Sequence, residues 1–138
     1  MLLDAFLYKV DREIVLQAEG PPLERLKGWV QQMGRFFSGE NGIVVTRLLA
    51  AIQDSPNLRK EFLATIYAPR EKEAHAIAEE AIRRGDLPAD LGIRVFFDSI
   101  VGPLLVRLFL HREEIDDSFV SAVFDQVVAG ARARCPAK

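Results

Sequence analysis

The chain has 138 residues, of which 49% are hydrophobic and 28% charged, and its formal net charge is -2. This length predicts a single domain over 1–138, and this composition predicts a folded core and excludes a disordered chain. The near-neutral charge argues against a nucleic-acid-binding face, since such domains cluster Lys and Arg. The single cysteine, Cys135, excludes an internal disulfide or a cysteine metal cluster and suits a reducing cytoplasm.

Apolar residues recur at steps of three and four along the first part of the chain, which predicts three amphipathic helices. They run over residues 2–18, about 22–37 and 43–54, and the stretches "EGPP" (19–22) and "SGENG" (38–42) are predicted turns. The third segment is apolar on most of its sides, which predicts that it is the most buried helix.

A long fourth helix is predicted from residue 56 to about residue 84. Ser55 is a favourable N-cap with Pro56 at the first helical position, and Gly85 is a typical helix stop. Pro69 interrupts the interior of this segment. Because proline has no N–H to donate to the carbonyl four residues earlier, we expect a kink or a short break there.

A fifth helix, over residues 93–110, combines a long apolar run with Gly102 and Pro103 near its middle. At the helical step Asp98 and Ser99 fall on the same side as this pair, and the remaining circumference is Phe, Ile, Val and Leu. We expect Pro103 to bend the helix. Charged residues within the run argue against a membrane span, so no membrane association is expected.

The sixth helix begins near Asp116 or Asp117 and carries an apolar stripe. The fifth and sixth helices together offer more apolar surface than a thin bundle can cover, so we expect a second copy to cover it in a homodimer. The alternative is that both are core helices of one chain. The residues expected in the dimer interface are Val101, Leu104, Leu105, Leu108, Phe119, Val120, Val123, Phe124 and Val127.

These elements predict an all-α fold of about six helices, and much of the sequence resembles a known family. The stretches "RRGDLPADL" and "FFDSIVGPLLVRLFLHREEIDDSFVSAVFDQVV" resemble the C-terminal regulatory domain of TetR-family transcriptional repressors, as do "SPNLRKEF" and "APREKE" upstream. That family has a Gly-acidic-Leu turn, a helix with Asp-x-x-x-Gly-Pro-Leu-x-x-Arg-Leu-x-Leu, and an acidic cap before Phe-Val. The matching positions are Gly85, Asp86, Leu87, Asp90, Leu91, Asp98, Gly102, Pro103, Leu104, Arg107, Leu108, Leu110, Phe119 and Val120.

The resemblance implies a bundle of the TetR C-terminal-domain type, with a ligand cavity among its middle helices and a four-helix dimer interface formed by its last two helices. It also implies that residues 1–18 are a linking helix toward an N-terminal helix-turn-helix domain. That domain is not present in this chain, and DNA would be bound only through it. The expected function is effector sensing and dimerisation in a bacterial, cytoplasmic repressor. The alternative is a stand-alone helical dimerisation or adaptor module without a small-molecule ligand.

Aromatic residues gather in the second, fourth and fifth segments, and a mostly apolar pocket with a few polar groups suits a small hydrophobic or amphipathic effector. The alternative is that these aromatics are core residues. Thr46 and Thr65 are candidates for polar contacts. The candidate ligand-binding residues are Trp29, Met33, Phe36, Gln53, Phe62, Ile66, Phe96 and Phe97.

No nucleophile elbow, phosphate loop, paired-cysteine site or HExxH motif occurs in the sequence, so we expect no catalytic residue, no cofactor and no enzyme activity. Glu71, His75 and Glu79 share one helix face. They either bind a divalent metal or form a solvated face, and the solvated face is the commoner case for such a row. We therefore expect no metal. Asp98 is either a base or has a simpler role, as the partner of Arg94 four residues earlier or, through a water, as a cap of the carbonyls near Pro103.

Overall fold

The computed structural model describes residues 2–133, so Cys135 lies outside the described residues. Within this range every regular element is helical, which confirms the predicted all-α fold. None of the described helices is both long enough and apolar enough to cross a bilayer. The helices are α1 (Leu2–Glu13), α2 (Pro22–Ser38), α3 (Glu40–Asp54), α4 (Pro56–Phe62), α5 (Ala68–Arg83), α6 (Ile93–Val106) and α7 (Asp117–Ala133), with π-helical segments at Leu63–Tyr67 and Arg107–His111.

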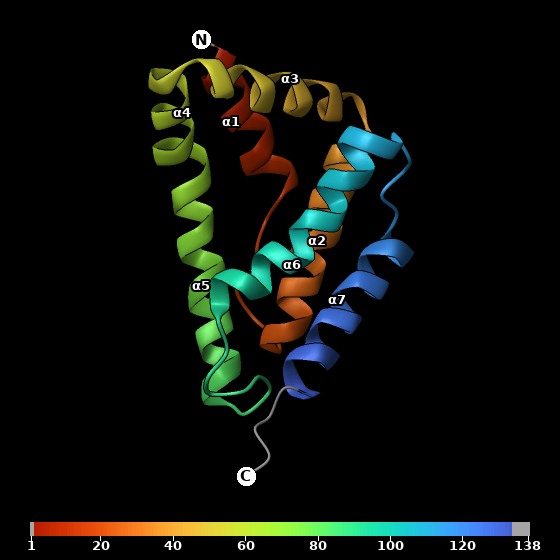
Figure 1. Ribbon diagram of the computed structural model, residues 1–138. Helices are drawn as coiled ribbons and strands as arrows, with labels where there is room; N and C mark the ends of the chain where they lie inside the picture. Colours follow the sequence, from red (N-terminus) through yellow and green to blue (C-terminus); the bar gives the residue numbers. More distant parts are fainter. Residues whose placement is uncertain (1, 134–138) are drawn as a thin grey trace.

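The helix α2 is the centre of the bundle. It packs against α3, α5 and α7, and Figure 1 shows α5 and α7 on either side of it, with α6 crossing in front from the α5 side. Leu26 and Val30, one turn apart on α2, have no exposed surface. The expectation that the third segment is the most buried helix is wrong. Helix α3 lies across one end of the bundle and leaves Ile43 half exposed, because no element covers its far side.

Helices α4 and α5 form one continuous rod, so the chain has about six helical units, as predicted. The π-helical segment Leu63–Tyr67 lies directly before Pro69 and joins the two, with the Ala68 N–H donating to the carbonyl of Leu63. A wider turn of this kind relieves the clash that the proline ring causes in a regular α-helix. The predicted irregularity at Pro69 is therefore confirmed, and it takes the form of a π turn rather than a break.

The predicted helix ends are confirmed at three places. The Ser55 hydroxyl accepts a hydrogen bond from the Leu58 N–H at 3.2 Å, and the Asp116 carboxylate accepts one from the Phe119 N–H at 2.8 Å. Gly85, with φ of 83°, follows α5 in the left-handed conformation that favours glycine. Helix α6 continues through Pro103, and its path in Figure 1 bends midway.

Two predicted boundaries are wrong. The first helix ends at Glu13 rather than residue 18, because the Gln32 side chain bonds to both the N–H and the carbonyl of Val15, at 2.7 and 3.0 Å, and so replaces helical hydrogen bonds. The predicted turn 38–42 is reduced to Gly39, and α3 begins at Glu40. Residues 14–21 are consequently an extended connection, and the α2–α3 junction is very tight.

Candidate functional site

Three of the predicted ligand-binding aromatics come together between α2 and α6. The ring centroids of Trp29 and Phe97 are 6.3 Å apart and those of Phe96 and Phe97 are 5.4 Å apart, both in edge-to-face geometry. Phe96 also meets Phe124 of α7 at 6.3 Å. Trp29 and Phe96 are buried, whereas Phe97 remains half-buried. The cluster is therefore part of the core with one ring near the surface.

Polar side chains connect the first π-helical segment, α5 and α6. The Tyr67 hydroxyl donates to the Glu71 carboxylate at 3.3 Å, and Arg94 reaches the same carboxylate oxygen at 3.7 Å. The His75 ring centroid is 6.4 Å from that of Phe97. Burial, followed by the nearby Glu71 carboxylate, raises the pKa of Tyr67. These contacts link α5 to α6 at the edge of the aromatic cluster.

The predicted row of Glu71, His75 and Glu79 is not assembled as a metal site. Glu71 is engaged by Tyr67 and Arg94, and His75 packs on an aromatic ring. Among residues 2–133 no group of three or more His, Cys, Asp or Glu side chains has a geometry suited to a metal. Asp98 lies 4.0 Å from Arg94, which is the simple pairing expected from the sequence, and both side chains are exposed.

The other predicted ligand-binding residues are more dispersed. Met33 and Phe62 are half-buried, and Ile66 is buried. Phe36 packs against Phe6 of α1, with ring centroids 5.9 Å apart, rather than against the α6 aromatics. Gln53 is exposed on α3, where it donates to the Leu49 carbonyl and accepts from Arg59. The structure thus places Gln53 on the surface, away from the aromatic rings.

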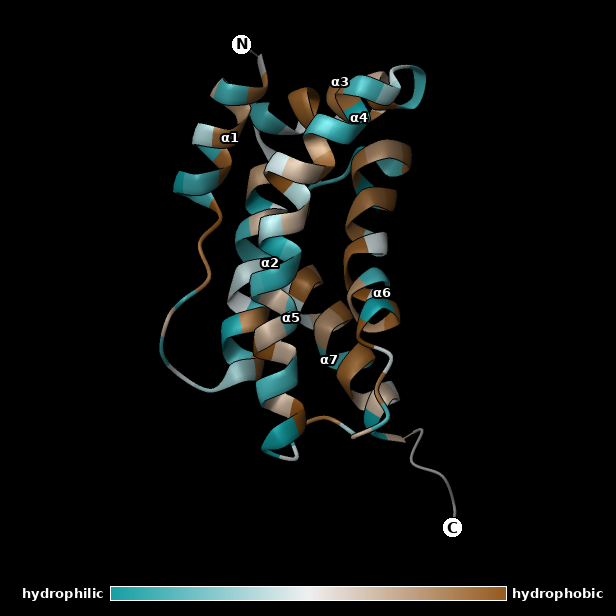
Figure 2. Ribbon diagram, turned by 90° about the vertical axis from the view of Figure 1, so that its left-hand side faces the viewer, coloured by the Kyte–Doolittle hydropathy of each residue, from teal (hydrophilic) through white to brown (hydrophobic). Residues whose placement is uncertain are grey.

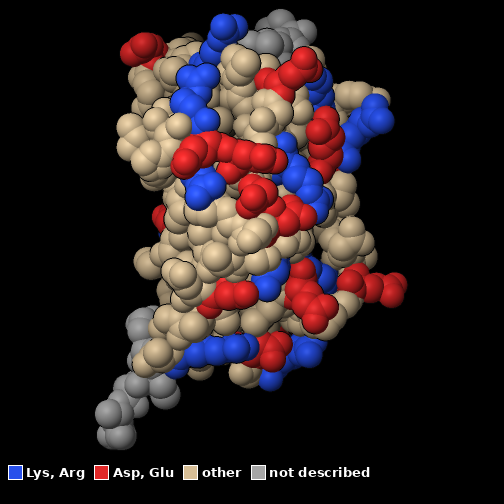
Figure 3. Space-filling view, turned by 90° about the vertical axis from the view of Figure 1, so that its right-hand side faces the viewer, with Lys and Arg blue, Asp and Glu red and all other residues tan. Residues whose placement is uncertain are grey.

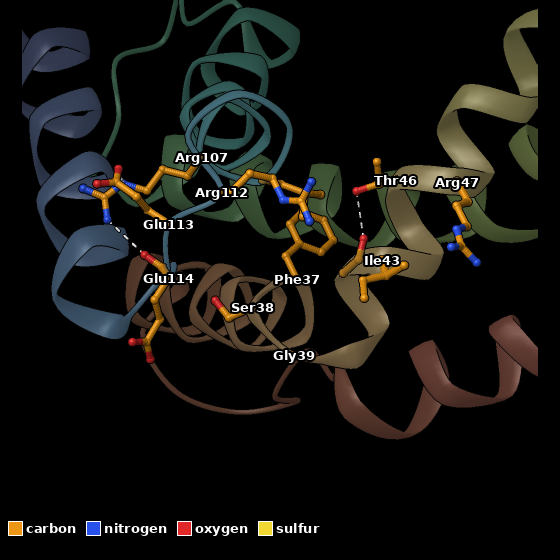
Figure 4. Close-up of a pocket in the computed structure, with 12 residues that line it drawn as sticks. Phe37, Ser38, Gly39, Ile43, Thr46, Arg47, Arg107, Arg112, Glu113 and Glu114 are labelled. Atoms are coloured by element: carbon orange, nitrogen blue, oxygen red, sulfur yellow. Dashed lines mark hydrogen bonds and ion pairs between the residues drawn. The ribbon is translucent and has the colours of Figure 1, made fainter.

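A hollow of about 610 Å³ lies elsewhere, at the α2–α3 junction. Its walls come from the end of α2, the first turns of α3 and residues 107–114, and Figure 4 shows these side chains. Of the residues predicted from the sequence to contact a ligand or a second copy, Thr46 and Leu108 border it, and the Thr46 hydroxyl donates to the Gly42 carbonyl at 2.9 Å. Sequence reasoning missed the rest of this site because its residues lie in distant segments; the Arg- and Glu-rich stretch after α6 was the one local signal.

The predicted dimer residues divide into two groups. Leu104 and Val120 have no exposed surface, and Phe124 and Leu108 are at most 9% exposed, so these four lie in the core of their own chain. Apolar spacing identified them as packed but did not reveal which neighbour covers them. The predicted residues that keep accessible surface are Val101, Leu105, Phe119, Val123 and Val127.

Helix α6 also exposes a stripe that the prediction did not include. Val95 is 69% exposed and Val106 is 46% exposed, with Phe109 following at 43% in the π-helical segment. Ser99 and Gly102 lie between them at steps of four and three residues. We call Val95, Ser99, Gly102, Val106 and Phe109 the outer stripe of α6. Figure 2 shows hydrophobic colouring along most of this helix.

Charge is dispersed on the neighbouring side of the molecule. Figure 3 looks onto the side that carries α7 and shows acidic and basic side chains interleaved with uncharged areas. On this side Lys27 pairs with Asp125 at 2.7 Å, and Arg35 pairs with Asp117. Arg107 lies over the ring of Phe119, 3.8 Å from its centroid. No single-sign patch therefore marks this visible face as a nucleic-acid surface.

The described residues form a helical bundle with one outward apolar helix and one mixed aromatic–polar cluster. Residues 17–127 match the family described as tetracyclin repressor-like, C-terminal domain. The chain therefore belongs to the TetR-type regulators, as the resemblance of its sequence implied.

Two individual proteins are similar to this chain. The chain is 26% identical over 133 residues to the "uncharacterized HTH-type transcriptional regulator YdeS" of Bacillus subtilis (strain 168), a match that covers 96% of this chain and 67% of YdeS. Its fold is similar to the crystal structure of the TetR family transcription regulator SCO0332, with a TM-score of 0.80 and 23% identity over 97% of this chain and 72% of that one.

Proposed function

We propose that this chain is the effector-sensing and dimerisation domain of a TetR-type repressor in the bacterial cytoplasm. It would bind a small hydrophobic or amphipathic ligand, and DNA would be bound through a helix-turn-helix domain. The family match supports this proposal, as does the HTH designation of the Bacillus subtilis relative, of which this chain covers 67%.

The observation that carries the dimer proposal is the outer stripe of α6. Val95 and Val106 of α6 and Phe109 of the following π-helical segment are each more than two-fifths exposed, and most side chains of α6 are apolar. Burying such side chains stabilises an assembly by about 25 cal/mol per Å² of apolar surface. Alternating steps of four and three residues are the spacing with which two helices pack side by side, and Ser99 and Gly102 between them would permit close approach.

Replacement of Val106 by glutamate tests this interface. We expect sedimentation velocity to show a dimer for the native chain and a rise of at least about tenfold in the dissociation constant for Val106→Glu, because a charge would have to be buried. The matched control is Leu63→Glu. Leu63 lies on a different helical segment, and its exposed fraction of 42% is close to the 46% of Val106. A native chain that stays monomeric at micromolar concentration, or an equal effect of both variants, contradicts the proposal.

The effector site is proposed at the cluster of Trp29, Phe96 and Phe97. Half-buried Phe97 supplies apolar surface at this site. The linked polar side chains of Tyr67, Glu71 and Arg94 supply polar groups, and such a combination suits an amphipathic molecule. The edge-to-face packing of these rings favours the second candidate function, a dimerisation module whose aromatics are simply core.

Arg70 connects the segment around Ile66 to α1, and this connection would allow effector binding to change the position of α1. Arg70 lies one residue after Pro69, donates to the Ile66 carbonyl at 2.8 Å, and forms an ion pair with Asp11 of α1. A ligand that displaces the segment around Ile66 would therefore act on α1. We propose α1 as the element whose tilt reports binding, in a two-state shift.

Thermal-shift measurements with hydrophobic compounds separate the two candidate functions. A ligand of the folded state raises the melting temperature by mass action, and the fluorescence of Trp29, the only tryptophan, reports on binding beside it. We expect a compound that raises the melting temperature by several degrees and changes Trp29 emission. If no compound in a broad screen does so, the ligand-free dimerisation module is the better description.

A further inference from the structure

The hollow at the α2–α3 junction has an apolar lining and is separate from the aromatic cluster. Phe37 of α2, Ile43 of α3 and Leu108 of the second π-helical segment contribute to its walls. Phe37 is half-buried and Ile43 is 53% exposed, so apolar surface is available to a bound molecule. Figure 4 shows Phe37 at the end of α2 and Ile43 in the first turns of α3.

The rim of this hollow carries unbalanced positive charge. Among the residues that the structure describes, Arg47 and Arg112 have no ion-pair partner. Arg107 is already engaged, because it contacts Glu113 at 3.8 Å and donates to the Glu114 carbonyl at 2.9 Å. Figure 4 shows the Glu114 carboxylate directed away from Phe37 and Arg112. Two guanidinium groups therefore remain to attract an anion.

The backbone of Arg112 supplies an independent observation. Arg112 has φ of 58° and ψ of 39°, and it is the non-glycine residue with positive φ in residues 2–133. A side chain in this left-handed region costs roughly 1 kcal/mol or more, and glycine or asparagine is preferred where a helix ends this way. The Arg112 N–H donates to the Arg107 carbonyl at 2.7 Å, and this hydrogen bond stabilises the strained backbone conformation. Figure 4 shows Arg112 among the residues that line the hollow.

We propose that this hollow binds an amphipathic carboxylate, with the carboxylate held by Arg112, the positive charge of Arg47 adding to the attraction, and the apolar tail lying on Phe37, Ile43 and Leu108. Strained residues at a surface concavity are typical of ligand sites, because the geometry is kept for contact rather than stability. A volume of about 610 Å³ is in the range of small-molecule sites. This site is additional to the effector site proposed at Trp29 and does not depend on it.

The test measures binding of decanoate, below its micellar concentration, to the native chain by calorimetry, with decan-1-ol as a neutral molecule of the same tail. We expect decanoate to bind at least about tenfold more tightly than decan-1-ol, because a hydrogen bond to a charged group contributes more than a neutral one. We also expect added sodium chloride to weaken decanoate binding. Equal affinity for the two molecules overturns the proposal.

Replacement of Arg112 separates binding from folding. Arg112→Gly relieves the left-handed strain, so the melting temperature is expected to stay level or rise while decanoate affinity falls at least about tenfold. Arg47→Gln is expected to weaken binding several-fold, and Arg83→Gln, an exposed arginine at the far end of α5, to leave it unchanged. Decanoate binding that survives Arg112→Gly overturns the proposal. Binding that is instead lost in Phe97→Leu also overturns it, and leaves the effector site at Trp29 intact.

Discussion

Glycine occurs inside helices both at the α2–α3 junction and on the outer stripe of α6, but its surroundings differ between the two regions. A Cβ atom at Gly42 would lie 2.0 Å from the Phe37 carbonyl oxygen, and one at Gly34 would lie 2.9 Å from Ile115. A Cβ atom at Gly102 would meet no heavy atom within 4 Å. Gly42 and Gly34 are therefore crowded by atoms of their own chain, whereas the outer side of α6 at Gly102 has no atom packed against it in the described residues.

Replacing Gly42 gives the largest expected effect, because the clashing atom belongs to the backbone and cannot move cheaply. We expect Gly42→Ala to lower the free energy of unfolding by about 3 kcal/mol or more, measured by urea denaturation with circular dichroism. An unchanged midpoint would mean that the junction is not as tight as the structure shows, and the contrast between the two regions would disappear.

Replacing Gly34 gives a smaller effect and offers a control in the same helix. We expect Gly34→Ala to cost about 1–3 kcal/mol, because the new methyl group meets side-chain atoms of Ile115 and Val120 that can partly yield. Gly28 lies earlier in α2, and a Cβ atom added there would have no neighbouring atom within 4 Å. Gly28→Ala is expected to add roughly 0.5–1 kcal/mol of stability through helix propensity. Equal effects of the two variants would show that crowding does not govern these positions.

Tyr67, at the end of the π-helical segment before α5, gives the smallest expected effect. Burial and the Glu71 carboxylate raise its pKa above 10.0, so the folded state holds this proton more tightly than the unfolded state. Any stability from this group is fully present below the unfolded pKa and is lost as the pH rises through the folded one. The contribution of Tyr67 to stability therefore declines at alkaline pH, not at acid pH.

Glu71→Gln sharpens this prediction. Removing the carboxylate charge is expected to move the pKa of Tyr67 back toward 10.0, while burial keeps it somewhat higher. Absorbance titration of the phenolate in a Tyr8→Phe background follows this group alone, since the chain has two tyrosines. A midpoint that does not move would show that Glu71 has no influence on Tyr67.

The sequence predicted the helices well because their signals are local. Ser55, Gly85 and Pro69 act through hydrogen bonds and backbone angles within a few residues of themselves, and the structure confirms each. The failed boundary at Glu13 has a non-local cause, since the Gln32 side chain that satisfies Val15 lies on another helix. Periodicity also placed Leu104 and Val120 in the dimer interface, although both are buried within their own chain.

The amino-acid sequence by itself determined the all-α class, the number of helical units, the irregularity at Pro69 and the family. These depend on spacing, capping and motif order, which are properties of neighbouring residues. Only the tertiary structure decided that Val95 and Val106 face outward and that Phe37, Arg47 and Arg112 surround one hollow. The physical reason is that burial and charge balance depend on which distant segments meet, and the left-handed turn at Arg112 is set by the packing that follows α6 rather than by the preference of arginine.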